Sequence, residues 1–192
     1  MRTSSLLLSL ACLLCAPVTH AQAFLFDWAG GMGSTEQDEG RGIATDAAGN
    51  VYTIGIFEST WDSDPGPDVH PLVSAGIKDV FISKLDPSGA YVWAKRIGGP
   101  AEDYGNAIAT DAEGNVYATG YFAGTVDFDP GDSTYLLSST SGYNDAFILK
   151  LDANGAFVWA QRIGATNPDY GYGITVDRSG HVLVTGGLLQ AC

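Results

Sequence analysis

Apolar and polar residues alternate with a period of two along most of the chain, in short runs separated by glycine and aspartate. In the central part these runs are NAIATD (106–111), NVYATGYF (115–122), DAFILKLD (145–152) and AFVWAQRIG (156–164). β-Branched and aromatic residues dominate them, and no stretch has the 3.6-residue period of an amphipathic helix. The pattern therefore predicts four short strands, with tight turns between the first two and between the last two.

The same pattern recurs at an interval of 65 or 66 residues. Three sets of residues carry the register: Trp28, Trp93 and Trp159; Asp46, Asp111 and Asp177; Gly55, Gly120 and Gly186. One residue is inserted between Gly131 and Gly142, which changes the offset from 65 to 66. A repeat of this length indicates a repeat architecture, and four short antiparallel strands per repeat are typical of a β-propeller blade. The three repeated aspartates begin Asp-x-x-Gly turns, where we expect them to accept local backbone hydrogen bonds.

The repeated residues also carry a family resemblance. The sequence GIATDAAGNVY, followed by DVFISKLDPSGAYVWAKRIGG, resembles the bacterial seven-bladed β-propeller repeat family (SBBP repeats) and, more distantly, blades of the NHL type. The resemblance covers essentially the whole chain after residue 23. It implies a propeller of exported bacterial proteins, and it implies no particular reaction because the family is defined by its repeat.

The repeats divide the chain into five segments. They are a signal peptide (1–23), the outer strand of a closing blade (24–33), blade 1 (34–98), blade 2 (99–164) and the first half of a truncated blade 3 (165–192). The sequence thus predicts an all-β protein made of about two and a half blades, an incomplete ring. Propellers close with roughly four to eight blades. We therefore expect either a fragment of a longer propeller or self-association of several chains through open blade edges.

The first 23 residues have the composition of a secretory signal. Arg2 is followed by the apolar run LLLSLACLLCAPV and by the small residues of AQA. The run is shorter than the ~20 residues that cross a bilayer, so we expect no membrane span. Cys12 and Cys15 leave lipid attachment as an alternative, although neither lies in a good lipobox. We expect a bacterial protein that is secreted or displayed at the cell surface, whose mature chain, with Cys192 as its one cysteine, forms no intramolecular disulfide.

The chain is strongly acidic. Its formal net charge is −13, which becomes −14 once Arg2 is removed with the signal. Such a surface repels nucleic acid and anionic membranes and attracts cations. We therefore expect no nucleic-acid partner, and an unknown protein or glycan as the ligand.

Acidic loops follow the second strand of each unit, with the sequences WDSDPG and VDFDPGD. Calcium prefers six to eight oxygen ligands, which closely spaced aspartates beside a glycine can supply. The candidate ligands are Asp62, Asp64, Asp127, Asp129 and Asp132. The alternative is a turn, in which aspartate accepts local backbone N–H groups and proline presets φ. Both interpretations stay open at this point, and calcium is the one cofactor that the sequence suggests.

In an up-and-down blade, the loop between the second and third strands and the connection to the next blade share one face. We therefore expect the acidic loops to lie with Glu102, Asp103 and Asp145 on the face where ligands usually bind. Tyr104 and Tyr170, in the blade connections, are the candidates to surround a central pocket.

Other aromatic and histidine residues favour structural roles. We expect Trp28, Trp93 and Trp159 to pack against neighbouring blades rather than to form a sugar-binding platform. His70 and His181 are the histidines outside the signal. His181 stands at a turn position that asparagine holds in the other two units, so we interpret it as a surface substitution.

No sequence feature predicts catalysis. The acidic residues that could pair recur from blade to blade, whereas an active site normally occurs once, and no GxSxG nucleophile motif is present. We therefore expect an exported, non-catalytic binding or scaffold module. The alternative is a truncated fragment of a larger propeller protein that would be a carbohydrate-active or other hydrolytic enzyme.

Overall fold

The computed structural model describes residues 27–140 and 142–188, so the expected signal peptide lies outside the described residues. The described part consists of strands and loops, and it contains no helix long and apolar enough to cross a membrane. One four-stranded antiparallel sheet has the order β1 (Asp38–Thr45), β2 (Val51–Phe57), β5 (Asp79–Leu85) and β6 (Tyr91–Ile97). We call this sheet blade 1.

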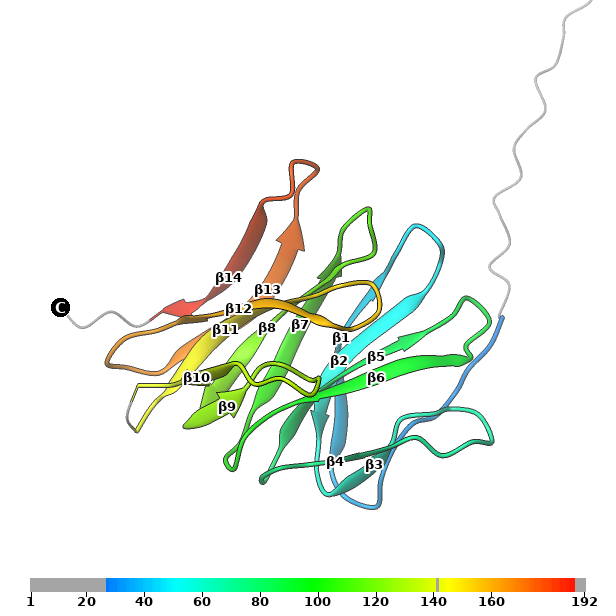
Figure 1. Cartoon of the computed structure of the whole chain (residues 1–192), viewed down its shortest axis with the longest axis horizontal. Coiled ribbons are helices and arrows are strands. Elements are labelled where there is room, and N and C mark those ends of the chain that lie inside the picture. Colours follow the sequence, from blue (N-terminus) through cyan, green and yellow to red (C-terminus); the bar gives the residue numbers. More distant parts are fainter. Residues whose placement is uncertain (1–26, 141, 189–192) are drawn as a thin grey trace, which may run out of the picture.

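A second sheet repeats this arrangement. Blade 2 contains β7 (Tyr104–Thr110), β8 (Val116–Ala123), β11 (Asn144–Leu151) and β12 (Phe157–Ile163), in the same up-and-down order. A third pair, β13 (Asp169–Val176) and β14 (Val182–Leu188), corresponds to the first half of a further blade (Figure 1). The predicted fold is confirmed: the described residues form successive propeller blades and no closed ring. Among them β14 pairs only with β13, and this free edge is where the sequence predicts self-association.

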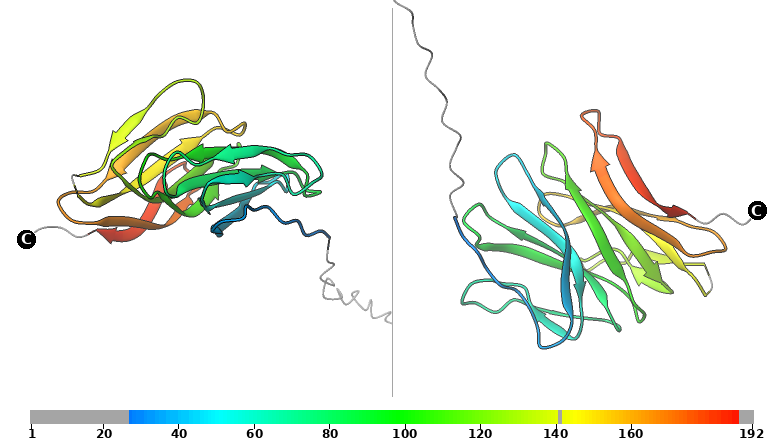
Figure 2. Two further views of the ribbon diagram at one scale, coloured as in Figure 1. Left: turned by 90° about the horizontal axis from the view of Figure 1, so that it is seen from below. Right: turned by 180° about the vertical axis from the view of Figure 1, so that it is seen from behind.

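The first strand of each blade lies on the inner side of the array. β1, β7 and β13 run side by side (Figure 2), and hydrogen bonds join neighbours, including Thr110 Oγ1 to the Thr45 carbonyl at 3.0 Å. The main core lies between blades 1 and 2. There Trp93, from the outer strand of blade 1, donates its indole N–H to the Ala153 carbonyl in blade 2 at 3.4 Å. The predicted packing role of Trp93 is confirmed.

Two short hairpins replace the expected acidic loops. They are formed by β3 (Thr60–Asp62) with β4 (Pro71–Val73) and by β9 (Thr125–Asp127) with β10 (Leu136–Ser138). Each follows a residue with positive φ, Ser59 at 58° and Gly124 at 73°, which reverses the chain. The reversal places Trp61 on the sheet face of blade 1, where its ring centroid lies 4.4 Å from that of Phe81.

These hairpins correct the expected placement of the acidic residues. Asp127 bridges to Gly98 at the end of β6, but Asp129 and Asp132 line a pocket with Asn154, in the turn between β11 and β12. That turn lies at the opposite end of the blade from Glu102 and Asp103. The expectation that all these acids share one face is therefore wrong, because burying the apolar hairpin residues folds the loop back along the blade.

The Asp-x-x-Gly turns form as expected. Asp46 Oδ1 accepts the backbone N–H groups of Ala48 at 2.9 Å and Asn50 at 3.0 Å, and Gly49 has a φ of 84°. The turns that begin at Asp111 and Asp177 have the same pair of hydrogen bonds. The turn interpretation of these three aspartates is confirmed.

The segment before blade 1 contains no strand over residues 27–32, and Gly33 forms a single bridge to Asp62. Its assignment to the outer strand of a closing blade stays a prediction.

Candidate binding surface on the inner strands

A β-bulge occurs at the same place in each inner strand. The pairing of β1 with β2 shifts register between Gly40 and Gly42, which leaves Arg41 as the extra residue. The corresponding extra residues are Asn106 in β7 and Tyr172 in β13. A bulge leaves one residue outside the ladder and redirects its side chain, and bulges are frequent beside functional sites. The fold thus presents three different side chains from one repeated backbone feature.

A close approach of the inner and second strands accompanies each bulge. A Cβ built on Gly120 would lie 1.8 Å from the carbonyl oxygen of Tyr104, and the equivalent distances are 1.9 Å at Gly55 and 2.0 Å at Gly186. Atoms cannot approach so closely, so these positions require glycine. The repeated glycines seen in the sequence are therefore part of the geometry that forms the bulge.

Four tyrosines form a row across blade 2 and the third strand pair. Tyr104 stacks on Tyr121 with ring centroids 4.7 Å apart, and Tyr121 meets Tyr170 edge to face at 4.8 Å. Tyr170 in turn stacks on Tyr172 at 6.1 Å. We call these four residues the tyrosine row. The structure thus connects Tyr104 and Tyr170 through Tyr121, and their expected place around a central pocket stays a prediction.

Two cations lie at the blade 1 end of the tyrosine row. Arg41 Cζ lies 4.9 Å, and Lys78 Nζ 5.7 Å, from the centroid of the Tyr104 ring. Arg41 also donates to Asn106 Oδ1 at 2.9 Å, and Asn106 Nδ2 donates to the Gly171 carbonyl at 2.8 Å. The bulge residues therefore connect three neighbouring inner strands and combine cationic, amide and aromatic groups on one surface.

The charges around the tyrosine row are of both signs. Arg41 pairs with Glu39 at 3.2 Å and Lys78 with Glu58 at 3.5 Å. Desolvation raises the pKa of Tyr121 to about 12, and Tyr104 adds to the shift. The Tyr121 hydroxyl can therefore serve as a hydrogen-bond donor, next to aromatic rings that offer apolar area. Such a surface suits the recognition of a polar ligand.

Buried acids make structural contacts within both blades. Asp103, at the start of blade 2, accepts the N–H groups of Gly99 at 2.7 Å and Ala123 at 3.2 Å. Asp79 is fully buried and pairs with Arg96 at 3.0 Å, and its Oδ1 has no hydrogen-bond partner. The same pair recurs in blade 2 as Asp145 with Arg162. Repetition of this kind marks a structural junction rather than a site.

The predicted calcium ligands form turns. Asp127 Oδ1 accepts the N–H groups of Asp129 at 3.1 Å and Tyr135 at 2.8 Å. Asp62 Oδ1 accepts those of Asp64 at 3.2 Å and His70 at 3.1 Å, while Asp132 is exposed near the hairpin tip. In the described part of the chain no three His, Cys, Asp or Glu side chains are placed to hold a metal ion. Their arrangement does not fit a calcium cage built from protein side chains, and a calcium site stays a prediction of the sequence.

His70 and His181 lie apart from the inner strands. His181 is exposed, and its Nδ1 lies 2.9 Å from Asp177 Oδ2, where Asn50 Nδ2 lies 2.7 Å from Asp46 Oδ2 in blade 1. The interpretation of His181 as a surface substitution agrees with this geometry. His70 stacks on Tyr91 with ring centroids 4.1 Å apart, in a groove at the outer side of blade 1.

Comparisons with known proteins agree with this architecture. The family model described as "Beta-propeller repeat" (SBBP) matches residues 92–121 and 158–186. Each match begins in the outer strand of one blade and ends in the second strand of the next. The repeat that the model describes thus crosses the junction between neighbouring blades.

Two curated proteins are similar over most of the chain. An "Uncharacterized WD repeat-containing protein L264" of Acanthamoeba polyphaga mimivirus is 24% identical over 182 residues, which cover 83% of this chain and 13% of that protein. The "Regulatory protein FlaEY" of Caulobacter vibrioides is 26% identical over 150 residues, or 77% of this chain and 15% of that protein. The chain therefore spans a small part of the length of both relatives. The sheet topology and the two matches to the family model agree that the chain contains β-propeller blades, with repeats similar to the SBBP repeat at these two places.

Proposed function

We propose that this chain is a non-catalytic, ligand-binding part of an exported bacterial propeller protein, and that the tyrosine row with Arg41 is its contact surface. The repeat family and the WD-repeat relative support a binding or scaffold module. Export rests on the sequence of residues 1–23 alone. The ligand class is a polar surface, a glycan or a protein, because the tyrosine row combines aromatic faces with hydroxyl, amide and guanidinium donors.

One observation carries this proposal. The bulge backbone is repeated in three inner strands, but the residue it presents changes from Arg41 to Asn106 to Tyr172. Residues that only maintain the fold recur in this chain, as the glycines at 55, 120 and 186 do. A side chain that differs at a fixed place on adjacent blades is expected of a surface that contacts a non-repetitive ligand.

The experiment is a glycan microarray probed with the full chain, followed by titration of each bound glycan. Tyr172 is 59% exposed at the end of the tyrosine row, so Tyr172→Ala should weaken binding by about tenfold or more, as expected when an aromatic contact is removed. Tyr143→Ala is the matched control, because Tyr143 is 43% exposed on the loop before β11 and has no ring contact with the tyrosine row. Equal loss in both variants would contradict the proposed surface. Binding to no glycan would restrict the ligand to the protein class.

The alternative is that the chain is part of a larger propeller protein with a hydrolytic activity located elsewhere. The two relatives, of which the chain covers 13% and 15%, are consistent with propeller repeats inside much longer proteins. Sequencing the gene beyond the codon for Cys192 tests this alternative, because further repeats of the GTVDFDPG type would appear there. The proposed function does not depend on calcium.

A further inference from the structure

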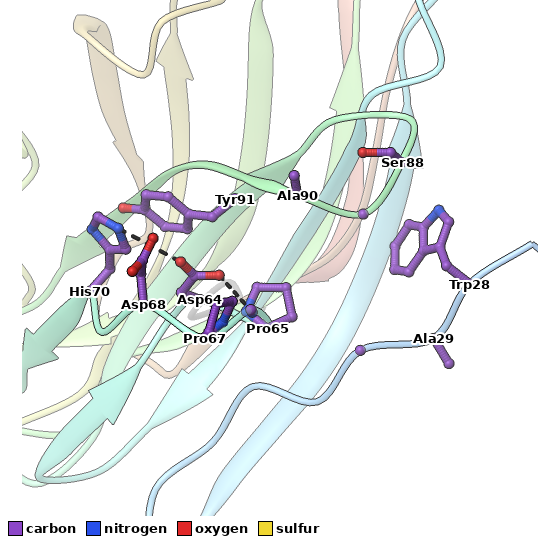
Figure 3. A pocket seen from close by; sticks show the side chains of 13 residues that line it. Trp28, Ala29, Asp64, Pro65, Pro67, Asp68, His70, Ser88, Ala90 and Tyr91 are labelled. Atoms are coloured by element: carbon purple, nitrogen blue, oxygen red, sulfur yellow. Dashed lines mark hydrogen bonds and ion pairs between the residues drawn. The ribbon is translucent and has the colours of Figure 1, made fainter.

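A groove of about 340 Å³ lies at the outer side of blade 1, between the segment before the blade and the tip of the β3–β4 hairpin (Figure 3). Trp28 forms one wall, and the stacked pair of His70 and Tyr91 lies toward the other end. Pro65 and Pro67 form its floor between them. The groove therefore has aromatic and aliphatic walls. None of its lining residues belongs to the tyrosine row or its cations, so the groove is independent of the function proposed above.

The polar groups of this groove are predominantly acidic. Asp64 and Asp68 line it, and the Asp64 side chain is 8% exposed. Asp64 Oδ1 accepts the Gly66 N–H at 2.7 Å, and its Oδ2 lies 3.7 Å from His70 Nε2. Among the described residues that line the groove there is no lysine or arginine. A mostly buried carboxylate is thus left without a permanent cationic partner.

Blade 2 has an equivalent groove, built from residues at a spacing of 65 or 66. Asp129, Pro130 and Gly131 take the places of Asp64, Pro65 and Gly66. The two tryptophan walls also correspond. A Cβ on Gly89 would lie 2.6 Å from the Trp28 ring, and one on Gly155 would lie 3.1 Å from the Trp93 ring.

The stacked pair at the end of the groove is repeated as well. Tyr135 and Phe157 of blade 2 have ring centroids 4.8 Å apart, in the places of His70 and Tyr91. The two grooves are therefore one repeated feature of the fold, and they can be compared residue by residue.

One of the replacements between the two grooves adds a cation in blade 2. Lys95 follows Trp93 by two residues, and Gly30 stands at the same place after Trp28. Lys95 lines both of the smaller pockets, about 270 and 280 Å³, that occupy this region in blade 2. Its Cε would lie 3.0 Å from a Cβ on Gly155, so the side chain extends along the groove. Lys95 thus places an alkylammonium side chain in the acidic, aromatic groove of blade 2, whereas Gly30 leaves the equivalent position in blade 1 without a side chain.

We propose that the blade 1 groove binds an alkylammonium ion, the chemistry of a lysine side chain, in the space that Lys95 occupies in blade 2. The Asp64 carboxylate supplies the counter-charge, and Asp68 adds a second one at the rim. The Trp28 and Tyr91 rings supply apolar area for the methylene groups and a π face for the ammonium group. The net charge of −13 attracts cationic ligands to the surface.

The first experiment is calorimetric titration of the full chain with n-butylammonium chloride, with n-butanol as the neutral control. We expect one site for the cation and none for the alcohol. Asp64→Asn keeps the oxygen that accepts the Gly66 N–H but removes the charge, so it should weaken binding by about tenfold or more. Asp129→Asn is the matched control in blade 2 and should leave binding unchanged. Absence of cation binding, or equal effects of both substitutions, would overturn the proposal.

A gain of binding gives a sharper test. Lys95→Ala vacates the equivalent groove, so the number of butylammonium sites should rise from one to two, and Asp129→Asn in that background should return it to one. A stoichiometry that does not change would overturn the proposed equivalence. Nα-acetyl-lysine amide then identifies the source of the ligand. Tighter binding than butylammonium indicates a lysine of a partner protein, and weaker binding indicates a free amine.

Discussion

Trp28 Nε1 donates a hydrogen bond to the carbonyl oxygen of Pro87 at 3.1 Å. Trp93 makes the same contact with Ala153 one blade later, at 3.4 Å. Pro87 and Ala153 are repeat equivalents, each following the aspartate of a turn between the third and fourth strands. The segment before blade 1 therefore packs as the outer strand of a preceding blade would pack, although its backbone forms no strand over residues 27–32.

The difference in burial predicts that replacing each tryptophan by alanine lowers the free energy of unfolding by a different amount. Trp93 is 9% exposed in the core between blades, so Trp93→Ala should lower the free energy of unfolding by about 3 to 5 kcal/mol. Trp28 is only partly buried. Trp28→Ala should therefore lower the free energy of unfolding by about 1 to 2 kcal/mol, because it removes one hydrogen bond and a partly buried ring. Urea denaturation measures both. Equal losses would show that the segment before blade 1 belongs to the core.

The strands were predictable because alternation with a period of two was strong and repeated. The expected run 106–111 corresponds to β7 at Tyr104–Thr110, an error of one or two residues at each end. The hairpins were missed because Trp61 and Val126 are single buried residues among turn-forming ones, and three-residue strands have too few positions to show a period. These short strands pair because Trp61 and Val126 are buried against the four-stranded sheet, which exists only in the folded blade.

The close approach at the repeated glycines predicts that a larger residue there destabilises the fold. Gly120→Ala would place a Cβ 1.8 Å from the Tyr104 carbonyl oxygen, so the inner strand of blade 2 must move. We expect a loss of about 3 kcal/mol or more in the free energy of unfolding, comparable to severe overpacking. Gly31→Ala is the control, since nothing lies within 4 Å of a Cβ there, and it should change stability by less than about 0.5 kcal/mol. A tolerated Gly120→Ala would contradict the close approach.

The inner-strand surface was only partly predictable. Tyr104 and Tyr170 were identified by their place in the blade connections, but Tyr121 was not, because its equivalents are Ile56 and Gly187. The bulge residues carry a signal in the sequence. Arg41, Asn106 and Tyr172 each follow a glycine in the inner strand, and they differ where that glycine repeats. Which groups meet across blades depends on the packing of β1, β7 and β13, and no pattern within one strand contains that information.

The hydrogen bonds of the acidic hairpins predict that removing metal ions does not change the melting temperature. Asp129 Oδ1 accepts the Gly131 N–H at 2.8 Å, and an asparagine oxygen can accept the same bond. We therefore expect Asp129→Asn to be nearly neutral for stability and EDTA to leave the melting temperature unchanged. Differential scanning fluorimetry with calcium or EDTA measures this. A rise in melting temperature with calcium that Asp129→Asn abolishes would instead support the calcium site that the sequence suggests.

Asp103 and the turn aspartates have opposite pKa shifts. Burial raises the pKa of Asp103 to about 7, with a further contribution from the charge of Asp79, against the backbone hydrogen bonds from Gly99 and Ala123. Burial also acts to raise the pKa of Asp111. There, however, hydrogen bonds from Asn115 and Tyr117 outweigh it, and the net shift is downward. The two groups therefore affect stability in different pH ranges.

These shifts predict a maximum of stability on the acid side of neutrality. Between pH 7 and the unfolded value of 3.8, the folded chain holds a proton on Asp103 that the unfolded chain releases, so stability rises as the pH falls through this window. The rise is at most about 1.4 kcal/mol per pH unit for one proton. Below pH 4 the stability contributed by Asp111 is lost as its carboxylate becomes protonated.

The test is the melting temperature of the full chain from pH 3 to pH 8. In Asp103→Asn the rise between pH 7 and pH 4 should disappear, and the variant should be less stable throughout because the amide cannot accept both backbone N–H groups. Asp111→Asn should keep that rise and weaken the loss below pH 4. A wild-type profile that falls steadily from pH 7 to pH 4 would contradict a neutral Asp103. It would mean that the hydrogen bonds from Gly99 and Ala123 hold the carboxylate ionised at the junction between the blades.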